Sequence, residues 1–489
     1  MQASIPSATL MTFAVYLIVL LAIGAIGYRA TRNLADYMLG GRRLGPGVAA
    51  LSAGASDMSG WLLLGLPGAI YASGLNQVWI AIGLTVGAYL NWQFVAKRLR
   101  VYTFTANDAI TVPDFLQKRF EDQRQALGVV ASLIILLFFA FYTSAGMVAG
   151  AKLFEATFGF DYHTALWIGG GIIVAYTFLG GFLAVSWTDF LQGLLMFAAL
   201  LIVPIIAFQA LGGWQPTVTA IDRIDPSYNG LFHDMSLFAI ISLAAWGLGY
   251  FGQPHIIVRF MALRDAAEVP RARLIGMSWM ILSLLGAVLV GYVGIAYFAD
   301  SPLEDAEKVF IALVTALTHP WIAGILLAAI LAAVMSTIDS QLLVASSALT
   351  EDIYKAFLRP RASETELLWV GRLAVVAIAV IALLIASDPQ AQVLGLVAYA
   401  WGGFGAAFGP VILFSLFWRR MTGTGALAGI IVGALTVVIW KQLAGGIFEM
   451  YEILPGFILA SVAIVGVSLL GQPAARMTAT FDQAAANWR

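Results

Sequence analysis

The stretch Gly54-Ala55-Ser56-Asp57-Met58-Ser59-Gly60 interrupts an apolar run that extends from Leu44 to Tyr71. A second apolar run, from Phe232 to Arg259, is interrupted in the same way by Trp246-Gly247-Leu248-Gly249-Tyr250-Phe251-Gly252. Glycine costs about 1 kcal/mol in a helix interior, and inside a bilayer each freed backbone group needs a new partner. Paired breaks in corresponding positions of two halves predict a substrate and ion site at the midplane of a secondary transporter.

The composition indicates a polytopic membrane protein. Hydrophobic residues make up 61% of the chain and charged residues 11%, whereas soluble proteins carry about 25% charged residues. The net charge of −1 gives no electrostatic case for nucleic acid binding. The chain has no cysteine, which excludes disulfides and thiolate chemistry. No HExxH, Walker or GxSxG context is present, so we expect no enzyme activity, and we infer no obligate protein partner.

Apolar periodicity predicts an all-α fold with thirteen transmembrane helices. Their approximate ranges are 8–28, 44–71, 75–96, 125–154, 163–180, 184–210, 232–258, 273–299, 319–347, 366–387, 391–418, 424–443 and 452–471. Arginine and lysine gather in the loops that follow the odd-numbered spans, as at Arg42 and Arg43 after span one, Lys97 and Arg98 after span three, and Arg259 after span seven. The positive-inside rule then places the N-terminus outside and the C-terminus in the cytoplasm.

Two sets of five spans, two to six and seven to eleven, start about 190 residues apart. An odd number of helices per set forces the second set to enter from the opposite side, which defines an inverted repeat. Coincidence in a long run of helices is the alternative. The predicted segments are a peripheral helix and loop at 1–43, the two repeats at 44–210 and 232–418, and two peripheral helices with a short tail at 419–489.

Span nine carries adjacent hydroxyls at Ser336 and Thr337. Together with Ala333 they are spaced i, i+3, i+4 and share one helical face. Hydroxyls and carbonyls on that face, opposite an unwound backbone, suit a hard cation of low charge, and sodium is the first choice. The alternative is that both hydroxyls bond back to carbonyls one turn earlier.

Three carboxylates fall within apolar spans. Asp57 lies near the centre of its span, where an ionisable side chain is by default a functional candidate. Its alternative role is to cap backbone N–H groups freed by the break. Asp189 and Asp339 lie toward the cytoplasmic ends of their spans and could form a cation release path. Structural pairing, for example with loop arginines, is the alternative for both.

Aromatic residues gather at the breaks. Trp246 and Tyr250 are spaced i, i+4 across the second break, Trp61 follows the first, and Tyr142 lies in the middle of span four. They could be plain packing, or they could wall a small pocket with an apolar body and a polar rim. We place no lysine or arginine mid-membrane, because Lys152, Arg372 and Lys441 fall near span ends. An anionic group would therefore depend on half-helix N-termini. This favours a small zwitterion.

The chain resembles the sodium/solute symporters, and within them the bacterial sodium/proline symporters. The resemblance covers nearly the whole chain and rests on five stretches. They are Tyr37 to Arg42 (YMLGGR), Ala53 to Trp61 (AGASDMSGW), Ser186 to Gln192 (SWTDFLQ), Trp246 to Arg259 (WGLGYFGQPHIIVR) and Met335 to Leu343 (MSTIDSQLL). It implies a five-plus-five inverted-repeat core with one helix before it and two after.

The resemblance also implies a sodium site. Its members are the backbone oxygens of Ala55, Met58 and Ala333 and the hydroxyls of Ser336 and Thr337.

The remaining implied roles concern substrate and coupling. Asp57, Ser59 and Gly60 match a stretch important for binding sodium and proline, and Asp189 matches a position linked to sodium release. The resemblance implies a coupling role for Asp339 less directly, because smaller polar residues also occur at this position in the family. The proposed proline pocket corresponds to Trp61, Gly65, Tyr142, Trp246, Tyr250 and Pro254.

The function predicted on this basis is sodium-coupled uptake of L-proline across a bacterial plasma membrane by alternating access, with Na⁺ as the coupling ion. Three alternatives remain open at the level of sequence. A symporter for pantothenate, a short carboxylate or a sugar would share the sodium site but differ in the aromatic set. A proton-coupled carrier would use Asp57 or Asp339. A membrane sensor would need an output domain or a partner kinase.

Overall fold

The computed structural model describes residues 7–30, 39–179 and 181–488, and their regular secondary structure is helical apart from one isolated β-bridge between Leu44 and Leu263. Nine helices in this part of the chain are long and apolar enough to cross a membrane, or ten if one bent pair counts as a span. Shorter apolar helices occupy Ser7–Ile23, Trp61–Ser73 and Tyr162–Ala175. The all-helical prediction is therefore confirmed.

One helix, or two consecutive helices, lies in each of the thirteen predicted ranges. Their bounds are α1 Ser7–Ala30, α3 Pro46–Asp57 with α4 Leu66–Ser73, α5 Val78–Leu90 with α6 Ala96–Thr105, α8 Ala126–Phe158, α9 Tyr162–Leu179, α10 Phe182–Ala210, α12 Leu237–Ala244 with α13 Pro254–Ala262, α14 Val269–Tyr297, α16 Pro320–Ser347, α17 Glu364–Ile385, α18 Val393–Phe417, α19 Gly423–Trp440 and α20 Ile453–Leu470. Residues 1–6 and 31–38 of the predicted segment 1–43 lie outside the described residues.

The first break falls where the sequence predicts it. Helix α3 ends at Asp57, and Met58 leaves the helical region with φ −83° and ψ 78°. The chain then continues through a π-helical turn, η2 (Trp61–Gly65), into α4. The Met58 N–H still reaches the Gly54 carbonyl at 2.8 Å, so the opening begins only beyond this bond.

The second break is a change of winding followed by a bend. After α12 the chain forms a 3₁₀ segment, η6 (Ala245–Phe251), and the axis then turns by 42° into α13. Pro254 is the first residue of α13 and lacks an N–H group, so it cannot bond to the carbonyl one turn earlier. Proline and the flanking glycines together explain why the helix is not continuous.

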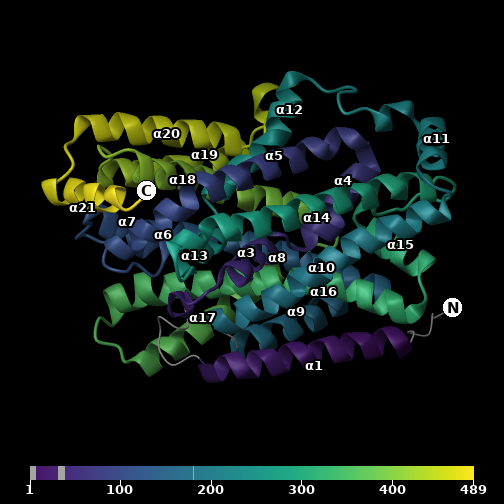
Figure 1. Cartoon of the computed structure of the whole chain (residues 1–489), viewed down its shortest axis with the longest axis horizontal. Coiled ribbons are helices and arrows are strands. Elements are labelled where there is room, and N and C mark those ends of the chain that lie inside the picture. Colours follow the sequence, from purple (N-terminus) through teal and green to yellow (C-terminus); the bar gives the residue numbers. More distant parts are fainter. Residues whose placement is uncertain (1–6, 31–38, 180, 489) are drawn as a thin grey trace.

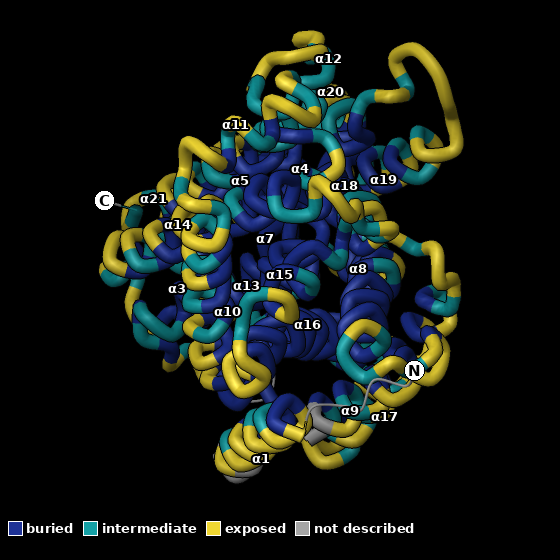
Figure 2. The backbone as a smooth tube through the Cα atoms, turned by 90° about the vertical axis from the view of Figure 1, so that its right-hand side faces the viewer, coloured by how far each residue is buried: buried dark blue, intermediate teal, exposed yellow. Residues whose placement is uncertain are grey.

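Parts of both broken helices lie in the interior: α3, η6 and α13 are mostly buried, and α3 and α13 contact α16. In the most apolar window of the span that contains α16, 83% of the residues are buried, against 28% for α20. Figure 2 shows α16 and α8 mostly buried and α1 largely exposed. In Figure 1, α1 runs along one edge of the molecule, and its first residues and the end of the last helix lie toward opposite ends of the long axis. Exposed apolar side chains on these outer helices face the surroundings that a bilayer would provide.

Four further helices lie in segments that the sequence analysis treats as loops or tail. They are α7 Val112–Phe120, α11 Trp214–Ile224, α15 Val309–Leu317 and α21 Ala475–Ala486. Helix α21 docks through Phe481, whose ring packs edge-on against Tyr102 at 6.1 Å, while Asp482 pairs with Arg419 at 2.7 Å. These helices are too short or too polar to give a transmembrane signal, so hydropathy did not reveal them.

Candidate functional site

The end of α3 meets the middle of α16 through oxygen atoms. The Ser336 hydroxyl donates to the Ala55 carbonyl at 2.8 Å, and the Thr337 hydroxyl reaches the same carbonyl at 3.3 Å. Ser336 also lies 3.1 Å from the Ala333 carbonyl, so the bond to its own helix predicted as the alternative is present as well. All four residues are buried. The structure thus gathers carbonyl and hydroxyl oxygens from two helices that are far apart in sequence.

Met58 immediately follows this cluster and is fully buried. It is the first residue whose backbone leaves the helical conformation of α3, although its N–H still bonds to the Gly54 carbonyl. Neutral oxygens in this arrangement suit a small monovalent cation, since hard cations prefer oxygen ligands.

Asp57 makes different contacts through its backbone and its side chain. Its carbonyl, freed by the break, accepts hydrogen bonds from the Trp61 indole at 3.1 Å and from the Tyr142 hydroxyl at 3.0 Å. Its carboxylate accepts a hydrogen bond from the Tyr250 hydroxyl, in place of the backbone N–H groups that the capping alternative predicts. The side chain therefore joins the first broken helix to the second.

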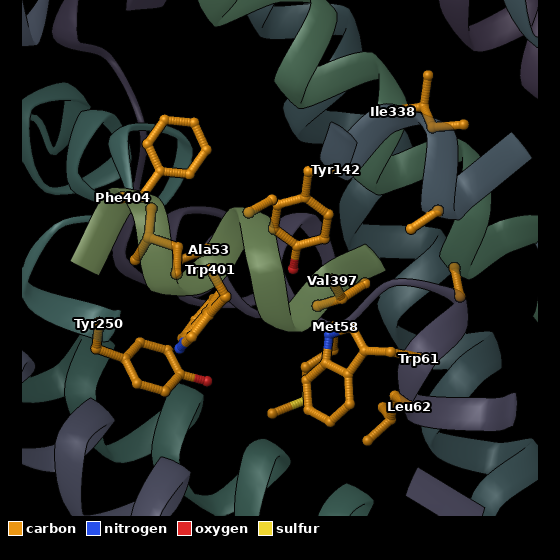
Figure 3. Close-up of a cluster of buried hydrophobic side chains, with 14 of the residues drawn as sticks. Ala53, Met58, Trp61, Leu62, Tyr142, Tyr250, Ile338, Val397, Trp401 and Phe404 are labelled. Carbon is orange, nitrogen blue, oxygen red and sulfur yellow. The ribbon is translucent and has the colours of Figure 1, made fainter. Parts of the chain in front are cut away.

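The predicted aromatic set does gather at the breaks. The rings of Trp61 and Trp246 lie 6.5 Å apart. Figure 3 shows the rings of Trp61, Tyr142 and Tyr250 around Met58, with the Tyr142 hydroxyl and the Trp61 ring nitrogen pointing toward the space between these two rings. The arrangement places large apolar faces beside a few polar atoms, as small-solute sites require.

Two aromatic residues at this cluster were not predicted. Trp401 of α18 packs edge-on against Tyr250 at 5.0 Å and donates its indole N–H to the Trp246 carbonyl at 2.7 Å. Tyr451 lies 5.2 Å from the Trp246 ring. Both come from segments distant in sequence, and neither stands beside a break or a polar motif that could have signalled it.

The other predicted pocket residues occupy separate places. Ser59 accepts the Trp61 backbone N–H at 3.4 Å, and Gly60 packs closely on the side chain of Ala149. Gly65 lines an open cavity of about 530 Å³. Pro254 lines a different cavity, of about 20 Å³. The structure thus keeps Ser59 and Gly60 next to the rings, whereas Gly65 and Pro254 face other spaces.

Asp189 forms a buried ion pair with Arg259 at 3.2 Å, and it accepts a hydrogen bond from Ser52 at 2.6 Å. Arg259 also donates to Ser340 and to the His255 carbonyl. The sequence analysis counted Arg259 as a loop residue that follows span seven. That prediction is wrong, because Arg259 lies inside α13 and is fully buried. Arginine pairing, the alternative role given for Asp189, is therefore present.

Asp339 does not join this ion pair. It is fully buried on α16 and accepts a hydrogen bond from the Thr177 hydroxyl of α9. The two carboxylates predicted as a release path thus face different partners: Asp189 contacts the second broken helix, and Asp339 contacts α9.

Lys152 is a second buried cation with carboxylate partners. Lys152 was expected near the end of span four, but its side chain is only 6% exposed and pairs with Glu307 at 2.7 Å and Asp305 at 3.0 Å. Glu307 also accepts the backbone N–H groups of Val393 and Leu394, each at 3.0 Å, at the N-terminus of α18. Lys152, Asp305, Glu307 and Leu394 line the 530 Å³ cavity, and the contacts of Glu307 connect α8 to α18.

An all-helical chain with many apolar helices, two of them broken beside a buried oxygen cluster and an aromatic cluster, has the architecture of a membrane transport protein. The sequence profile of the sodium:solute symporter family matches residues 37–433. The chain belongs to that family.

Curated relatives agree with this assignment over nearly their whole length. The chain is 55% identical to the sodium/proline symporter of Escherichia coli K12, with 99% of this chain and 98% of the relative covered. It is 56% identical to the high-affinity proline transporter PutP of Bacillus subtilis 168, with coverage of 95% and 98%.

Two solved structures share the fold. A Na⁺-coupled sialic acid symporter in a substrate-bound, outward-open state superposes with a TM-score of 0.81 at 20% identity, covering 96% of this chain and 99% of that one. Mhp1, a nucleobase-cation-symport-1 family transporter, gives 0.57 at 13% identity, covering 93% and 99%.

Proposed function

We propose that this protein takes up L-proline together with sodium across the bacterial plasma membrane by alternating access. Membership of the sodium:solute symporter family supports sodium coupling. The names of relatives more than half identical over nearly the full chain support proline as the solute. The structural observation that carries the proposal is the contact of Ser336 and Thr337 with the Ala55 carbonyl beside the aromatic cluster.

The proposed sodium site consists of the carbonyl oxygens of Ala55, Met58 and Ala333 and the hydroxyls of Ser336 and Thr337. The contacts between α3 and α16 support it, because the hydroxyls already lie at the carbonyl that the ion would share. A bound cation would replace these hydrogen bonds with ion–oxygen contacts and hold the end of α3 against α16. All of these ligands are uncharged, which favours a monovalent ion over calcium or magnesium.

The proposed proline site lies along the rings of Trp61, Tyr142, Trp246 and Tyr250, together with Ser59 and Gly60. The aromatic faces suit the apolar pyrrolidine ring, and peptide groups freed at the breaks suit the carboxylate and the ammonium. Gly65 and Pro254 complete the proposed substrate-binding set, and each lines a cavity of its own.

Coupling follows from the shared backbone of the two sites. The carbonyl of Asp57 holds Trp61 and Tyr142, and this residue lies two positions after Ala55. Sodium that orders the end of α3 therefore also orders the proline pocket, and by reciprocity proline tightens sodium binding. Inward movement of one charge gains about 2.3 kcal/mol per 100 mV of membrane potential. Asp57, Asp189 and Asp339 are assigned to sodium coupling or release, the last two on the cytoplasmic side.

The proposed topology has thirteen crossings, with the N-terminus outside, the C-terminus in the cytoplasm, and inverted repeats at 44–210 and 232–418. The segments 1–43 and 419–489 are then peripheral. The helices found in all thirteen predicted ranges support this arrangement. So do the opposite positions of the start of α1 and the end of α21 in Figure 1.

Sodium-dependent ligand stabilisation tests the proposed function. Proline at about 100 times its Kd is expected to stabilise the purified protein by about 2.7 kcal/mol, and only in sodium buffer. The measurement is the apparent unfolding temperature with proline, pantothenate, short carboxylates and sugars, each in sodium and in choline. If another solute stabilises the protein and proline does not, that solute is the substrate in place of proline. Equal stabilisation in choline would reject sodium coupling and favour a proton-coupled carrier.

Replacing Trp246 by alanine is expected to raise the half-saturating proline concentration for uptake about tenfold, equivalent to about 1.4 kcal/mol. That is the contribution of roughly 50 Å² of apolar contact with the solute. Initial uptake rates across a proline series in proteoliposomes measure the effect. Trp167→Ala is the matched control, because Trp167 is 50% exposed on α9. An unchanged half-saturating concentration in Trp246→Ala would remove this residue from the pocket.

A further inference from the structure

The carboxylate of Asp57 faces a small interior cavity that the proposed transport cycle does not use. Its volume is about 20 Å³, which is room for one water-sized occupant. Its lining residues come from α3, α5, the π-helical turn η4 (Asn91–Val95), η6, α13 and α14. The cavity therefore lies between the two broken helices, on a different side of α3 from the contact with α16.

Asn91 connects this cavity to the second broken helix. Its side chain is buried, and its Nδ2 atom donates to the Tyr250 carbonyl at 2.8 Å. In a continuous helix that carbonyl would bond to the residue four positions later, which is Pro254 and has no N–H group. The Asn91 amide thus supplies the donor that the proline withholds. Asn91 itself begins a π-helical turn, a distortion that is frequent at functional sites.

Two buried acceptors line the cavity without a hydrogen bond from the described part of the chain. They are Oδ1 of Asp57 and Oδ1 of Asn91. Two acceptors cannot satisfy each other, so they need an occupant that can donate to both. A water molecule has two donors and fits the volume. Such a molecule would connect the first broken helix to Asn91, in parallel with the bond from Tyr250 to Asp57.

Close backbone packing extends this connection along the helix. A Cβ atom added at Gly83 would meet the Ala244 carbonyl, and one added at Gly87 would meet the Gly247 carbonyl. Helix α5 therefore lies directly on η6 without intervening side chains. Asn91 continues the same interface by one further turn, so α5 and η6 are expected to move as one body.

We infer that Asn91 is a positioning residue for coupling: it holds Tyr250 in place and, through a shared water molecule, connects the Asp57 carboxylate to the second broken helix. The inference rests on the proposed sodium–proline function and adds a residue and a path to it. When sodium fixes the position of the end of α3, the contacts of Asp57, Tyr250 and Asn91 also fix the position of η6. The ratio of proline affinities with and without sodium depends on this path.

The decisive variant is Asn91→Asp, which keeps the shape of the side chain, removes the donor to Tyr250 and adds a negative charge beside Asp57. Purified full-length protein is titrated with radiolabelled proline in sodium and in choline. The factor by which sodium improves proline affinity is expected to fall at least about tenfold, a change of about 1.4 kcal/mol in coupling. Gln93→Ala is the matched control, because Gln93 lies in the same π-helical turn but is exposed. It should keep the wild-type ratio.

A merely structural role would lower the amount of active protein but would leave the affinity ratio unchanged. If the wild-type protein itself shows no sodium-dependent proline binding, the proposed function fails. If the wild type shows that dependence and Asn91→Asp keeps the full ratio, only the present inference is overturned.

Hydrogen exchange on the wild-type protein gives a second test that needs no variant. Sodium alone, without proline, is expected to slow amide exchange in residues 245–252 as well as at the end of α3. Protection confined to α3 and α16 would overturn the inference, even if Asn91→Asp does not fold.

Discussion

Proline uptake by the Ser336→Ala/Thr337→Ala double variant is expected to require at least roughly 100-fold more sodium than uptake by the wild type. Each hydroxyl would contribute a hydrogen-bond-strength contact to a charged partner, about 1.5–3 kcal/mol, and 1.4 kcal/mol corresponds to a factor of ten. The measurement is the initial rate of proline uptake into proteoliposomes over a sodium series at constant ionic strength.

The matched control is Ser346→Ala/Ser347→Ala. These neighbouring hydroxyls lie on the same helix but donate only to the Leu343 carbonyl, at 3.0 Å and 2.7 Å. The control should keep the sodium dependence of the wild type. Equal sodium activation in the Ser336 and Thr337 variant and in the wild type would reject the assigned site.

The second large effect is expected at the ion pair of Asp189 and Arg259. Both side chains are fully buried, so removing one leaves an unpaired charge in the interior. Such a change costs about 3–5 kcal/mol. Arg259→Met and Asp189→Asn should therefore each lower the apparent unfolding temperature of the purified protein markedly, measured at one fixed heating rate because membrane-protein unfolding is often irreversible.

The double variant Asp189→Asn/Arg259→Met separates pairing from packing. With both charges removed, no unpaired charge remains, and at least half of the lost stability should return. Ser186→Ala is a control on α10, the helix of Asp189, because Ser186 is buried but makes no ion pair. Additive losses in the double variant would show that the two residues act independently.

Local sequence signals predicted the parts of the fold and site that depend on neighbouring residues. Glycine clusters identified both breaks within a few residues, because glycine in an apolar run costs helix stability. The i, i+3, i+4 spacing placed Ala333, Ser336 and Thr337 on one face of α16, and the structure directs that face at Ala55. The helix ranges followed from hydropathy, since a bilayer demands long apolar segments.

Contacts between distant segments were not predictable in this way. Arg259 looked like a loop charge because it follows an apolar run, but α13 continues past it and buries it against Asp189. Trp401 and Asn91 carry no local motif, and their roles depend on carbonyls of η6 that lie about 155 and 159 positions away in sequence. Pro254 was the available signal for Asn91, because it leaves a carbonyl that some side chain must satisfy.

Direct binding of radioactive sodium to the purified protein, without proline, tests the central claim that α3 and α16 together hold the coupling ion. The account predicts saturable binding of one sodium ion per chain in the wild type and in Ser346→Ala/Ser347→Ala. It predicts loss of that binding in Ser336→Ala/Thr337→Ala. Undiminished binding in this last variant would mean that sodium is held elsewhere and would contradict the account.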